Sequence, residues 1–460
     1  MEQRALYRIP FRHSGSLRQL SFNFLRKNAN GFRDPAFSEN KTQPLHRWVP
    51  WIAGFSSQFV EDCFDTFVMH GRRKSTPNVL DPFAGVGTTL VQALVNGFDT
   101  VGFEINPYAA LACKVKLGLP KLDLATLETY CEEYRMIAAK GNSPVAAYNP
   151  SEFKTRIPFF SPRIEEQVLI FLDFVRGITH AEIADIFRVA LGSVMVSFSN
   201  YTYEPSLSSR PAVGKPLVEK ADVHSIILRK LHEMISDIRW FKERTASPSS
   251  SVGQGQIYNS NFMESAQVLP ANSIDLVVTS PPYMNNYHYV RNTRPQLFWL
   301  SLIASPKDLR VLEEANFGKY WQTVRDSPPV ELCFDHPELC QTLARLRRTR
   351  REKGSYGGPG WANYVSSYFN DCYQFVRILK RALVRGGVGV VVIGNSIIQG
   401  HEIRTDLVLA DIAHQTGLEL RGVQPIRTKR VGASITQSAV RRGHRNSATL
   451  YESAVVVRKK

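Results

Sequence analysis

The stretch of the chain that is most suited to chemistry is TSPPY, which follows the apolar run IDLVV at residues 274–278. An apolar run of this length predicts a strand buried in a parallel sheet. Pro281 and Pro282 lack N–H groups and have a fixed φ, so they predict a rigid turn just past the strand. Open α/β sheets bind their ligands at that edge. Ser280 and Tyr283 flank the prolines, and the turn would therefore hold a hydroxyl group and an aromatic ring at a binding site.

A second candidate site is the glycine-rich turn DPFAGVGTT, in which Gly85 and Gly87 separate a predicted strand from a predicted helix. Small residues there let backbone N–H groups approach a ligand. No Lys follows the glycines, so the turn is not a Walker A loop, and Leu90 replaces the third glycine of a dinucleotide-binding motif. Glu104 ends the next predicted strand, where an acid typically binds ribose hydroxyls. A nucleoside is therefore the favoured ligand, and a tight turn with a solvated Glu is the alternative.

The segments around both sites predict an α/β fold. The sequence from NVLDPFAGVGTT to FEINP reads as strand, turn, helix and strand, which is a βαβ opening. Helical patterns then dominate up to about Ser251 and interrupt the sheet. The run VGVVVIGNS, after a helix that Gly386 and Gly387 end, predicts another buried strand.

The composition indicates an acidic partner and a reducing compartment. The 460 residues include 57 Lys and Arg against 41 Asp and Glu, a formal charge of +16, which points to polyanions. Six cysteines without regular spacing do not form a disulfide framework. No apolar segment is long enough to span a bilayer and no signal sequence is recognisable. We expect a cytoplasmic protein that does not bind a membrane.

A metal site is not predicted. Cys333, His336 and Cys340 are close in sequence, but no fourth ligand is evident and the spacing fits no common zinc module.

Together, DPFAGVGTT, FEINP and TSPPY resemble the motifs of the amino-group DNA methyltransferases, especially the cytosine-N4 type. HRWVPWIAGFSSQFV is similar to the motif that precedes the glycine turn in this family. The resemblance implies a Rossmann-like methyltransferase sheet, with a helical insertion and a basic recognition segment, and S-adenosylmethionine as the cofactor. It assigns the cofactor site to Asp81, Phe83, Gly85, Gly87, Thr88, Thr89, Glu104 and Asn261, the last of which stands where an Asp is usual.

The same resemblance makes the TSPPY turn the catalytic site. An exocyclic amine is a poor nucleophile because its lone pair is delocalised into the ring. Ser280 and the carbonyl of Pro281 would accept hydrogen bonds from the amine, Pro282 would keep the turn rigid, and Tyr283 would stack on a flipped base. Methylation at cytosine C5 would need a Pro-Cys pair, and no cysteine follows a proline in this chain.

Several functions remain open at this stage. Ser280 favours cytosine N4 over adenine N6, because adenine enzymes more often have Asp or Asn there. An RNA amino-methyltransferase is the next alternative. A DNA-binding protein that has lost catalysis is a third, and the intact TSPPY turn argues against it. The target sequence, the oligomeric state and the presence of a cognate restriction endonuclease, as in a restriction-modification system, are not predicted.

Double-stranded DNA is the expected partner, and two groups of arginines are expected to contact it. The first is the run from 345 to 351 next to a glycine-rich stretch, for which a solvated charge run is the alternative. The second follows the catalytic turn and would clamp phosphates beside the flipped base. The predicted contacts are Arg291, Arg294, Arg347, Arg348, Arg350 and Arg351. RRGHRN, at 441–446, is a weaker candidate, and the helical insertion is another recognition element.

These expectations divide the chain into six segments. They are an N-terminal basic and aromatic region (1–75), the cofactor-binding part (76–120), the helical insertion (121–254), the catalytic part (255–302), a basic, turn-rich segment (303–360) and the C-terminal part of the sheet (361–460).

Overall fold

The computed structural model describes residues 32, 37–51, 54–68, 76–140, 152–203, 207–246, 253–285, 287–349, 358–429 and 450–460. Arg350, Arg351, the RRGHRN stretch and much of the N-terminal region predicted at 1–75 lie outside these residues. Among the described residues, no helix is both long and apolar enough to cross a membrane.

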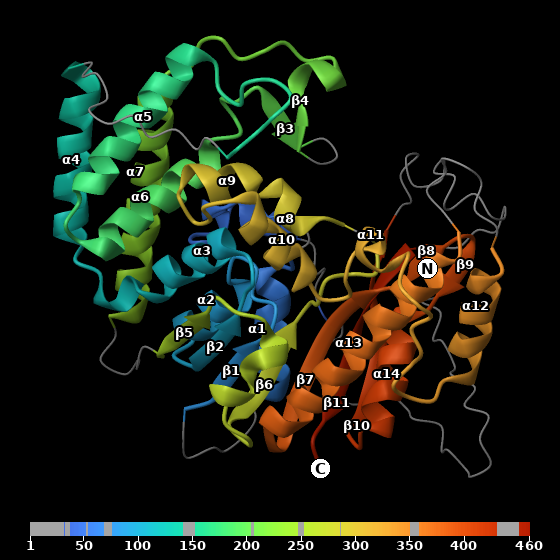
Figure 1. The fold of residues 1–460 in the computed structure, drawn as a ribbon. Coiled ribbons are helices and arrows are strands. Elements are labelled where there is room, and N and C mark those ends of the chain that lie inside the picture. The colour runs from blue at the N-terminus through green and yellow to red at the C-terminus, as the bar shows by residue number, and fades with distance from the viewer. Residues whose placement is uncertain are drawn as a thin grey trace, which may run out of the picture. The chain divides into compact units, whose positions relative to one another are not determined.

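The centre of the fold is a seven-stranded sheet (Figure 1). In spatial order its strands are β10 (Glu419–Lys429), β11 (Leu450–Arg458), β7 (Leu383–Gly394), β6 (Ile274–Thr279), β1 (Asn78–Asp81), β2 (Asp99–Phe103) and β5 (Gly255–Tyr258). β11 runs antiparallel to both of its neighbours, and the other adjacent pairs in this sheet are parallel. The predicted Rossmann-like α/β fold is confirmed.

The order of the strands predicts a ligand site between β1 and β6. From β1 the chain continues outward to β2 and β5, whereas β6 and β7 lie on the other side of β1. Connections that leave a sheet in opposite directions open a crevice at the carboxyl ends of the two central strands. The glycine-rich turn follows β1 and the TSPPY turn follows β6, so both lie at this crevice.

Both faces of the sheet are buried, which explains the continuous apolar runs of its strands. In β6, Leu276 and Val278 pack in the cluster that contains α1 (Ser57–Phe67), and Val277 packs in the opposite cluster. That opposite face is covered by α13 (Gly360–Ala382) and α14 (Thr405–Gln415). α2 (Thr88–Val95) follows the glycine-rich turn and packs on α1, β1 and β2.

The segment between β2 and β5 is mostly helical (Figure 1). Its helices share one hydrophobic core. α6 packs on α3, and α7 packs on α4, α5 and α6. The segment contains α3 (Pro107–Leu117), η4 (Leu119–Lys121), α4 (Leu124–Lys140), α5 (Pro162–Gly177), α6 (Ala181–Val194), β3 (Tyr201–Tyr203), β4 (Leu207–Ser209), η5 (Arg210–Val213) and α7 (Val223–Thr245).

The segment predicted as turn-rich, after the catalytic turn, contains helices. Asp308 and Ser305 form a capping box at the start of one, and His336 Nδ1 accepts a hydrogen bond from Leu339 N at the start of another. The remaining short elements are η2 (Phe37–Lys41), η3 (His46–Trp48), η6 (Phe262–Gln267), α8 (Tyr289–Asn292), α9 (Arg294–Trp299), α10 (Pro306–Glu314), α11 (Trp321–Val324), α12 (Pro337–Arg347), β8 (Ser396–Ile398) and β9 (His401–Ile403).

Candidate active site

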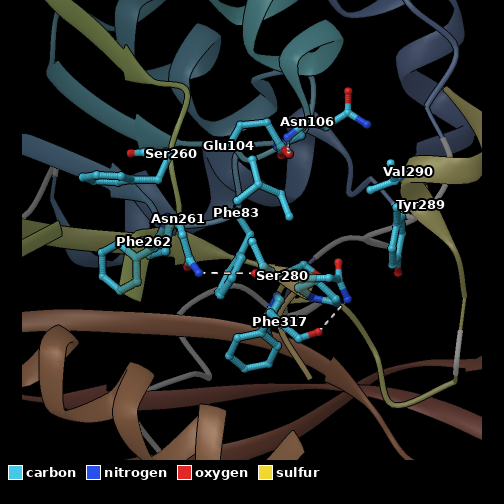
Figure 2. Close-up of a pocket in the computed structure, with 18 of the residues that line it drawn as sticks. Phe83, Glu104, Asn106, Ser260, Asn261, Phe262, Ser280, Tyr289, Val290 and Phe317 are labelled. Atoms are coloured by element: carbon cyan, nitrogen blue, oxygen red, sulfur yellow. Dashed lines mark hydrogen bonds between the residues drawn. The ribbon is translucent and has the colours of Figure 1, made fainter. Parts of the chain in front are cut away.

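A cavity lies at the crevice, bounded by residues that follow β1, β2, β5 and β6 (Figure 2). It brings together two predicted motifs that are separated by almost 200 residues of sequence. The predicted site residues among its walls are Phe83, Gly85, Glu104, Asn261, Ser280, Pro281, Pro282 and Tyr283.

Glu104 is the acidic group of the cavity. Its Oε2 accepts a hydrogen bond from Gly85 N at 2.8 Å, and its Oε1 accepts one from Asn106 N at 2.7 Å. Withdrawal from water raises the pKa of Glu104 to about 7, and these two backbone N–H groups oppose the shift. The carboxylate is therefore fixed against the glycine-rich turn, with its orientation set before a ligand binds.

Other predicted cofactor residues support the turn and are not among the walls of this cavity. Asp81 Oδ1 accepts hydrogen bonds from Thr279 Oγ1 at 2.7 Å and from Phe83 N at 3.1 Å, and burial raises its pKa to about 6. Thr89 Oγ1 donates to Val278 O at 3.0 Å. Both side chains thus connect the DPFAGVGTT segment to β6.

The two remaining predicted cofactor residues lie at the start of α2. Gly87 has a φ of +87°, and a Cβ there would come within 3.0 Å of Cys113 Sγ. Thr88 is buried, and its hydroxyl accepts a hydrogen bond from Asn40 Nδ2 at 3.5 Å.

Two side chains of α3 donate hydrogen bonds to backbone carbonyls of the glycine-rich turn. Lys116, with 1% of its surface exposed, donates from Nζ to Val86 O at 2.8 Å, and the Cys113 thiol donates to Gly85 O at 3.2 Å. Burial lowers the pKa of Lys116 to about 8. The sequence gives no signal for this role, because an isolated Lys in a helix is usually solvated.

Aromatic rings form one wall of the cavity. The Phe83 ring lies 5.0 Å from that of Phe317 and 6.4 Å from that of Phe262, in edge-to-face arrangements. Asn261 lies beside them: its Oδ1 accepts from Met263 N, and its Nδ2 donates to Ala315 O at 3.3 Å (Figure 2). A wall of this kind is suited to a flat, apolar ligand with polar edges.

The TSPPY turn also lines the cavity and is fixed by hydrogen bonds. Ser280 Oγ donates to the Tyr283 hydroxyl at 3.5 Å, and the Tyr368 hydroxyl donates to Pro282 O at 2.9 Å. The Tyr283 hydroxyl also hydrogen-bonds Glu452 of β11. Burial, and after it the nearby Glu452 carboxylate, raises the pKa of Tyr283 above its usual range.

The Tyr283 ring is held closely from the other side. A Cβ at Gly394 would come within 3.2 Å of it, so glycine at the end of β7 makes room for the ring. Neither Gly394 nor Glu452 could be identified from the sequence, because their proximity to Tyr283 depends on the pairing of β11 with β7.

The predicted DNA-contacting arginines differ in how they are placed. Arg294 is half-buried, lies over the Phe153 ring at 5.8 Å and donates to Lys154 O at 3.4 Å. Arg347 lies 2.9 Å from Glu331. Arg291 and Arg348 are exposed.

Comparison with known proteins finds similarity to methyltransferases. It is 22% identical to Type II methyltransferase M.BsoBI of Geobacillus stearothermophilus over 91% of this chain and 87% of that protein. It is also 22% identical to M.AvaI of Nostoc sp. over 87% and 84%, and 25% identical to M.MvaI of Kocuria varians over 48% and 50%. The chain is thus similar to Type II methyltransferases over most of its length.

No family model matches the chain. Among solved structures, the rRNA methyltransferase aviRa from Streptomyces viridochromogenes aligns at 11% identity over 92% of each chain, with a TM-score of 0.33. That score is too low to establish a shared topology.

Proposed function

We propose that the protein is a DNA methyltransferase that transfers a methyl group from S-adenosylmethionine to an exocyclic amine, namely N4 of cytosine. The observation that carries this proposal is that the glycine-rich turn, Glu104 and the TSPPY turn line one cavity. The similarity to Type II methyltransferases over 91% of the chain supports it. The protein would act on double-stranded DNA as part of a restriction-modification system, together with a cognate endonuclease in the cytoplasm.

The cavity residues fit S-adenosylmethionine. Glu104 offers a fixed carboxylate for the two ribose hydroxyls, and the wall of Phe83, Phe262 and Phe317 suits the adenine ring. Gly85 has a φ of +52°, and a Cβ there would come within 2.9 Å of Trp51 Nε1, so glycine lets the turn pack against the Trp51 ring that lines the cavity. When bound, S-adenosylmethionine supplies an electrophilic methyl group on a sulfonium.

The TSPPY turn then orients the amine. Because Ser280 Oγ donates its hydrogen to Tyr283, its lone pairs are free to accept an N–H of the target amine. Tyr283 in turn hydrogen-bonds the Glu452 carboxylate. A hydrogen-bond chain that ends on a carboxylate polarises each of its members and makes Ser280 a stronger acceptor. The same chain offers a path for the proton that N-methylation releases.

The choice of cytosine over adenine rests on Ser280. A neutral hydroxyl, supported by Tyr283, occupies the position where adenine enzymes more often have Asp or Asn. The adenine-N6 reaction would use the same donor cavity and the same geometry, so only the product distinguishes the two.

The decisive experiment is nucleoside analysis of DNA from cells that express the protein. After digestion, mass spectrometry with chromatographic standards should detect N4-methylcytosine and separate it from the 5-methyl isomer. Cells that express Ser280→Ala at the same level are the matched control and should lack the product. N6-methyladenine instead would overturn the base assignment, and methylated RNA without methylated DNA would overturn the substrate.

A further inference from the structure

Lys116 of α3 is a buried cation beside the candidate active site. It has 1% of its surface exposed, and its Nζ donates to Val86 O of the glycine-rich turn at 2.8 Å. Taking an ammonium group out of water costs more free energy than one hydrogen bond to a neutral carbonyl returns. An apolar side chain would fill the same space at a lower cost, so the charge itself requires an explanation.

The charged groups around Lys116 do not neutralise it. The titratable and charged groups that face it are Cys113 on its own helix, His46 of η3, and Lys230 and Asp237 of α7. Asp237 is the one carboxylate among these four, and its Oδ1 already pairs with Arg47 at 2.5 Å. Burial, together with the nearby Lys230 charge, lowers the pKa of Lys116 to about 8. Within the described part of the chain, Lys116 is therefore a cation without a carboxylate partner.

α3 fixes the glycine-rich turn and Glu104 together. At the start of this helix, Asn106 N donates to Glu104 Oε1 at 2.7 Å, and the Asn106 side chain caps the helix. Near its end, Lys116 donates to Val86 O, while Gly85 N donates to Glu104 Oε2 at 2.8 Å. These bonds form a closed ring through α3, the turn and the carboxylate that is proposed to bind the ribose.

The hydrogen bond from Lys116 sets the orientation of one peptide plane in the turn. The C=O and N–H groups of a trans peptide point in opposite directions, so a Val86 carbonyl that faces α3 directs the N–H of Gly87 away from α3. That N–H donates to Ala84 O at 2.7 Å and closes the turn. Without the bond from Lys116, this plane could rotate and the turn could open.

We infer that Lys116 is a positioning residue for the methyl donor, and that its ammonium group holds the glycine-rich turn in the conformation that binds the donor. This inference rests on the proposed function. A charge-assisted hydrogen bond is roughly twice as strong as a neutral one, so the ammonium holds the turn more firmly than the neutral amine would. Donor affinity should therefore fall as the pH rises through about 8, the pKa of Lys116.

The sign of this pH dependence is opposite to that expected for Glu104. Ionisation of the Glu104 carboxylate, with a pKa of about 7, improves ribose binding as the pH rises. Burial and the Lys116 charge lower the pKa of His46 to about 3, and burial raises the pKa of the Cys113 thiol well above its usual value, so neither group titrates in this range. Donor affinity should therefore be highest between pH values of about 7 and 8, with one limb from each residue.

The test measures S-adenosylmethionine affinity by calorimetry, from mildly acidic to mildly alkaline pH, in the wild type and in Lys116→Met. Methionine keeps most of the side-chain length and removes the charge and the donor. We expect roughly tenfold weaker binding in Lys116→Met at neutral pH, and no further decline above a pH of about 8. The ratio of the two affinities is compared at each pH, because ionisation of the ligand's own amino group then affects both proteins equally.

Lys114→Met is the matched control. It removes an exposed lysine of the same helix, which pairs with Asp185 at 2.8 Å, and the affinity should stay within about twofold of wild type at each pH. At saturating S-adenosylmethionine, Lys116→Met should methylate DNA with a kcat within about twofold of wild type, because the residue acts on donor binding and not on the transfer step.

A second measurement needs no variant and covers the case in which Lys116→Met does not fold. Methylthioadenosine contains the ribose and adenine of the donor but no ionisable amino-acid group. Its affinity for the wild type should fall roughly fivefold as the pH rises from about 7.5 to about 9.5.

The outcomes separate the two proposals. The inference would be overturned by an equal S-adenosylmethionine affinity in Lys116→Met and wild type, or by a ratio that is the same at every pH, as a merely structural lysine would give. It would also be overturned if methylthioadenosine failed to bind or bound without a decline at alkaline pH. Failure of the wild type to bind S-adenosylmethionine or to methylate DNA would overturn the proposed function itself.

Discussion

Trp51 and Tyr289 line two cavities, the candidate active site and a second one of about 420 Å³ that Gln296 also lines, and the polar side chains of the two are bonded differently. In the first, Glu104 already accepts two backbone N–H groups, and Asn261 is bonded at both ends of its amide. In the second, Gln296 Oε1 is buried without a donor. The polar groups of the first cavity are therefore fixed before a ligand arrives, as suits a cofactor site, whereas the amide of Gln296 is bonded at one end only.

Both cavities depend on one anchor in the helical insertion. Asp237 of α7 has 1% of its surface exposed and accepts hydrogen bonds from Leu45 N, from Trp48 Nε1 and from the Arg47 guanidinium. These bonds fix the segment that leads to Trp51, the ring common to both cavities. The insertion thus positions the site even though it lies outside the sheet.

Removing this anchor should disrupt both cavities at once and have the largest effect. Asp237→Ala leaves the buried donors Leu45 N and Trp48 Nε1 without their acceptor and Arg47 with only Glu233, at 4.0 Å, and we expect a loss of about 3 kcal/mol or more in the free energy of unfolding. Urea unfolding measures it. Asp222→Ala, which removes only the N-cap of the same helix, is the control and should cost about 1 kcal/mol. Equal losses in the two variants would contradict the anchoring role.

The second prediction concerns the TSPPY turn in the first cavity. Ser280→Ala should lower kcat by about a hundredfold or more, because the amine loses its acceptor, while both ligands still bind. Glu452→Gln should lower kcat by about tenfold, because the hydrogen-bond chain then ends on a neutral amide. Single-turnover methylation measures both rates, and calorimetry with S-adenosylmethionine is the control. A Glu452→Gln variant with unchanged kcat would remove β11 from the mechanism.

Changing Glu104 should affect the first cavity alone. Glu104→Gln should weaken S-adenosylmethionine binding by roughly tenfold, because an amide cannot accept both ribose hydroxyls in the same way. Wild-type binding should tighten as the pH rises through about 7, the pKa of Glu104, because the ionised carboxylate is the better acceptor. In the absence of the cofactor, the DNA affinity of the variant should equal that of the wild type. A difference in this affinity would contradict an effect limited to the first cavity.

The raised pKa of Glu104 also predicts how the free energy of unfolding depends on pH. Its folded-state pKa of about 7 lies above the ordinary value of 4.5, so between these values the folded protein binds a proton that the unfolded chain has released. The free energy of unfolding should therefore fall as the pH rises through this window, by at most about 3 kcal/mol from this group. Glu104→Gln should flatten the decrease, and the remainder would come from Asp81, whose pKa burial raises to about 6.

The smallest effects are expected from the arginines, which lie outside both cavities. If each of these exposed cations contacts one phosphate, Arg291→Ala and Arg348→Ala should each reduce the slope of DNA affinity against salt by about one. Arg347→Ala should change the slope less, because Arg347 already pairs with Glu331. Binding titrations at several salt concentrations measure the slopes. An equal change in all three variants would contradict this ranking.

The sequence predicted the parts of the site that are encoded locally. Gly85, Glu104 and the TSPPY turn each follow a strand, and the spacing of strand, turn and acid is readable within short windows. It did not predict Trp51, Gln296 or the Asp237 anchor, because their places depend on how the insertion packs on α3 and on the segment before α1. The sequence also does not show which arginines have partners within the chain, as Arg294 and Arg347 do.

The position of β11 has a consequence for how the protein is made. β11 pairs with both β7 and β10, and its Glu452 completes the hydrogen-bond chain at Tyr283. A nascent chain on the ribosome cannot complete this sheet until residues 450–458 have emerged, although both motif turns were synthesised long before. The residues of the glycine-rich turn are thus available earlier in synthesis than the complete hydrogen-bond chain at Tyr283.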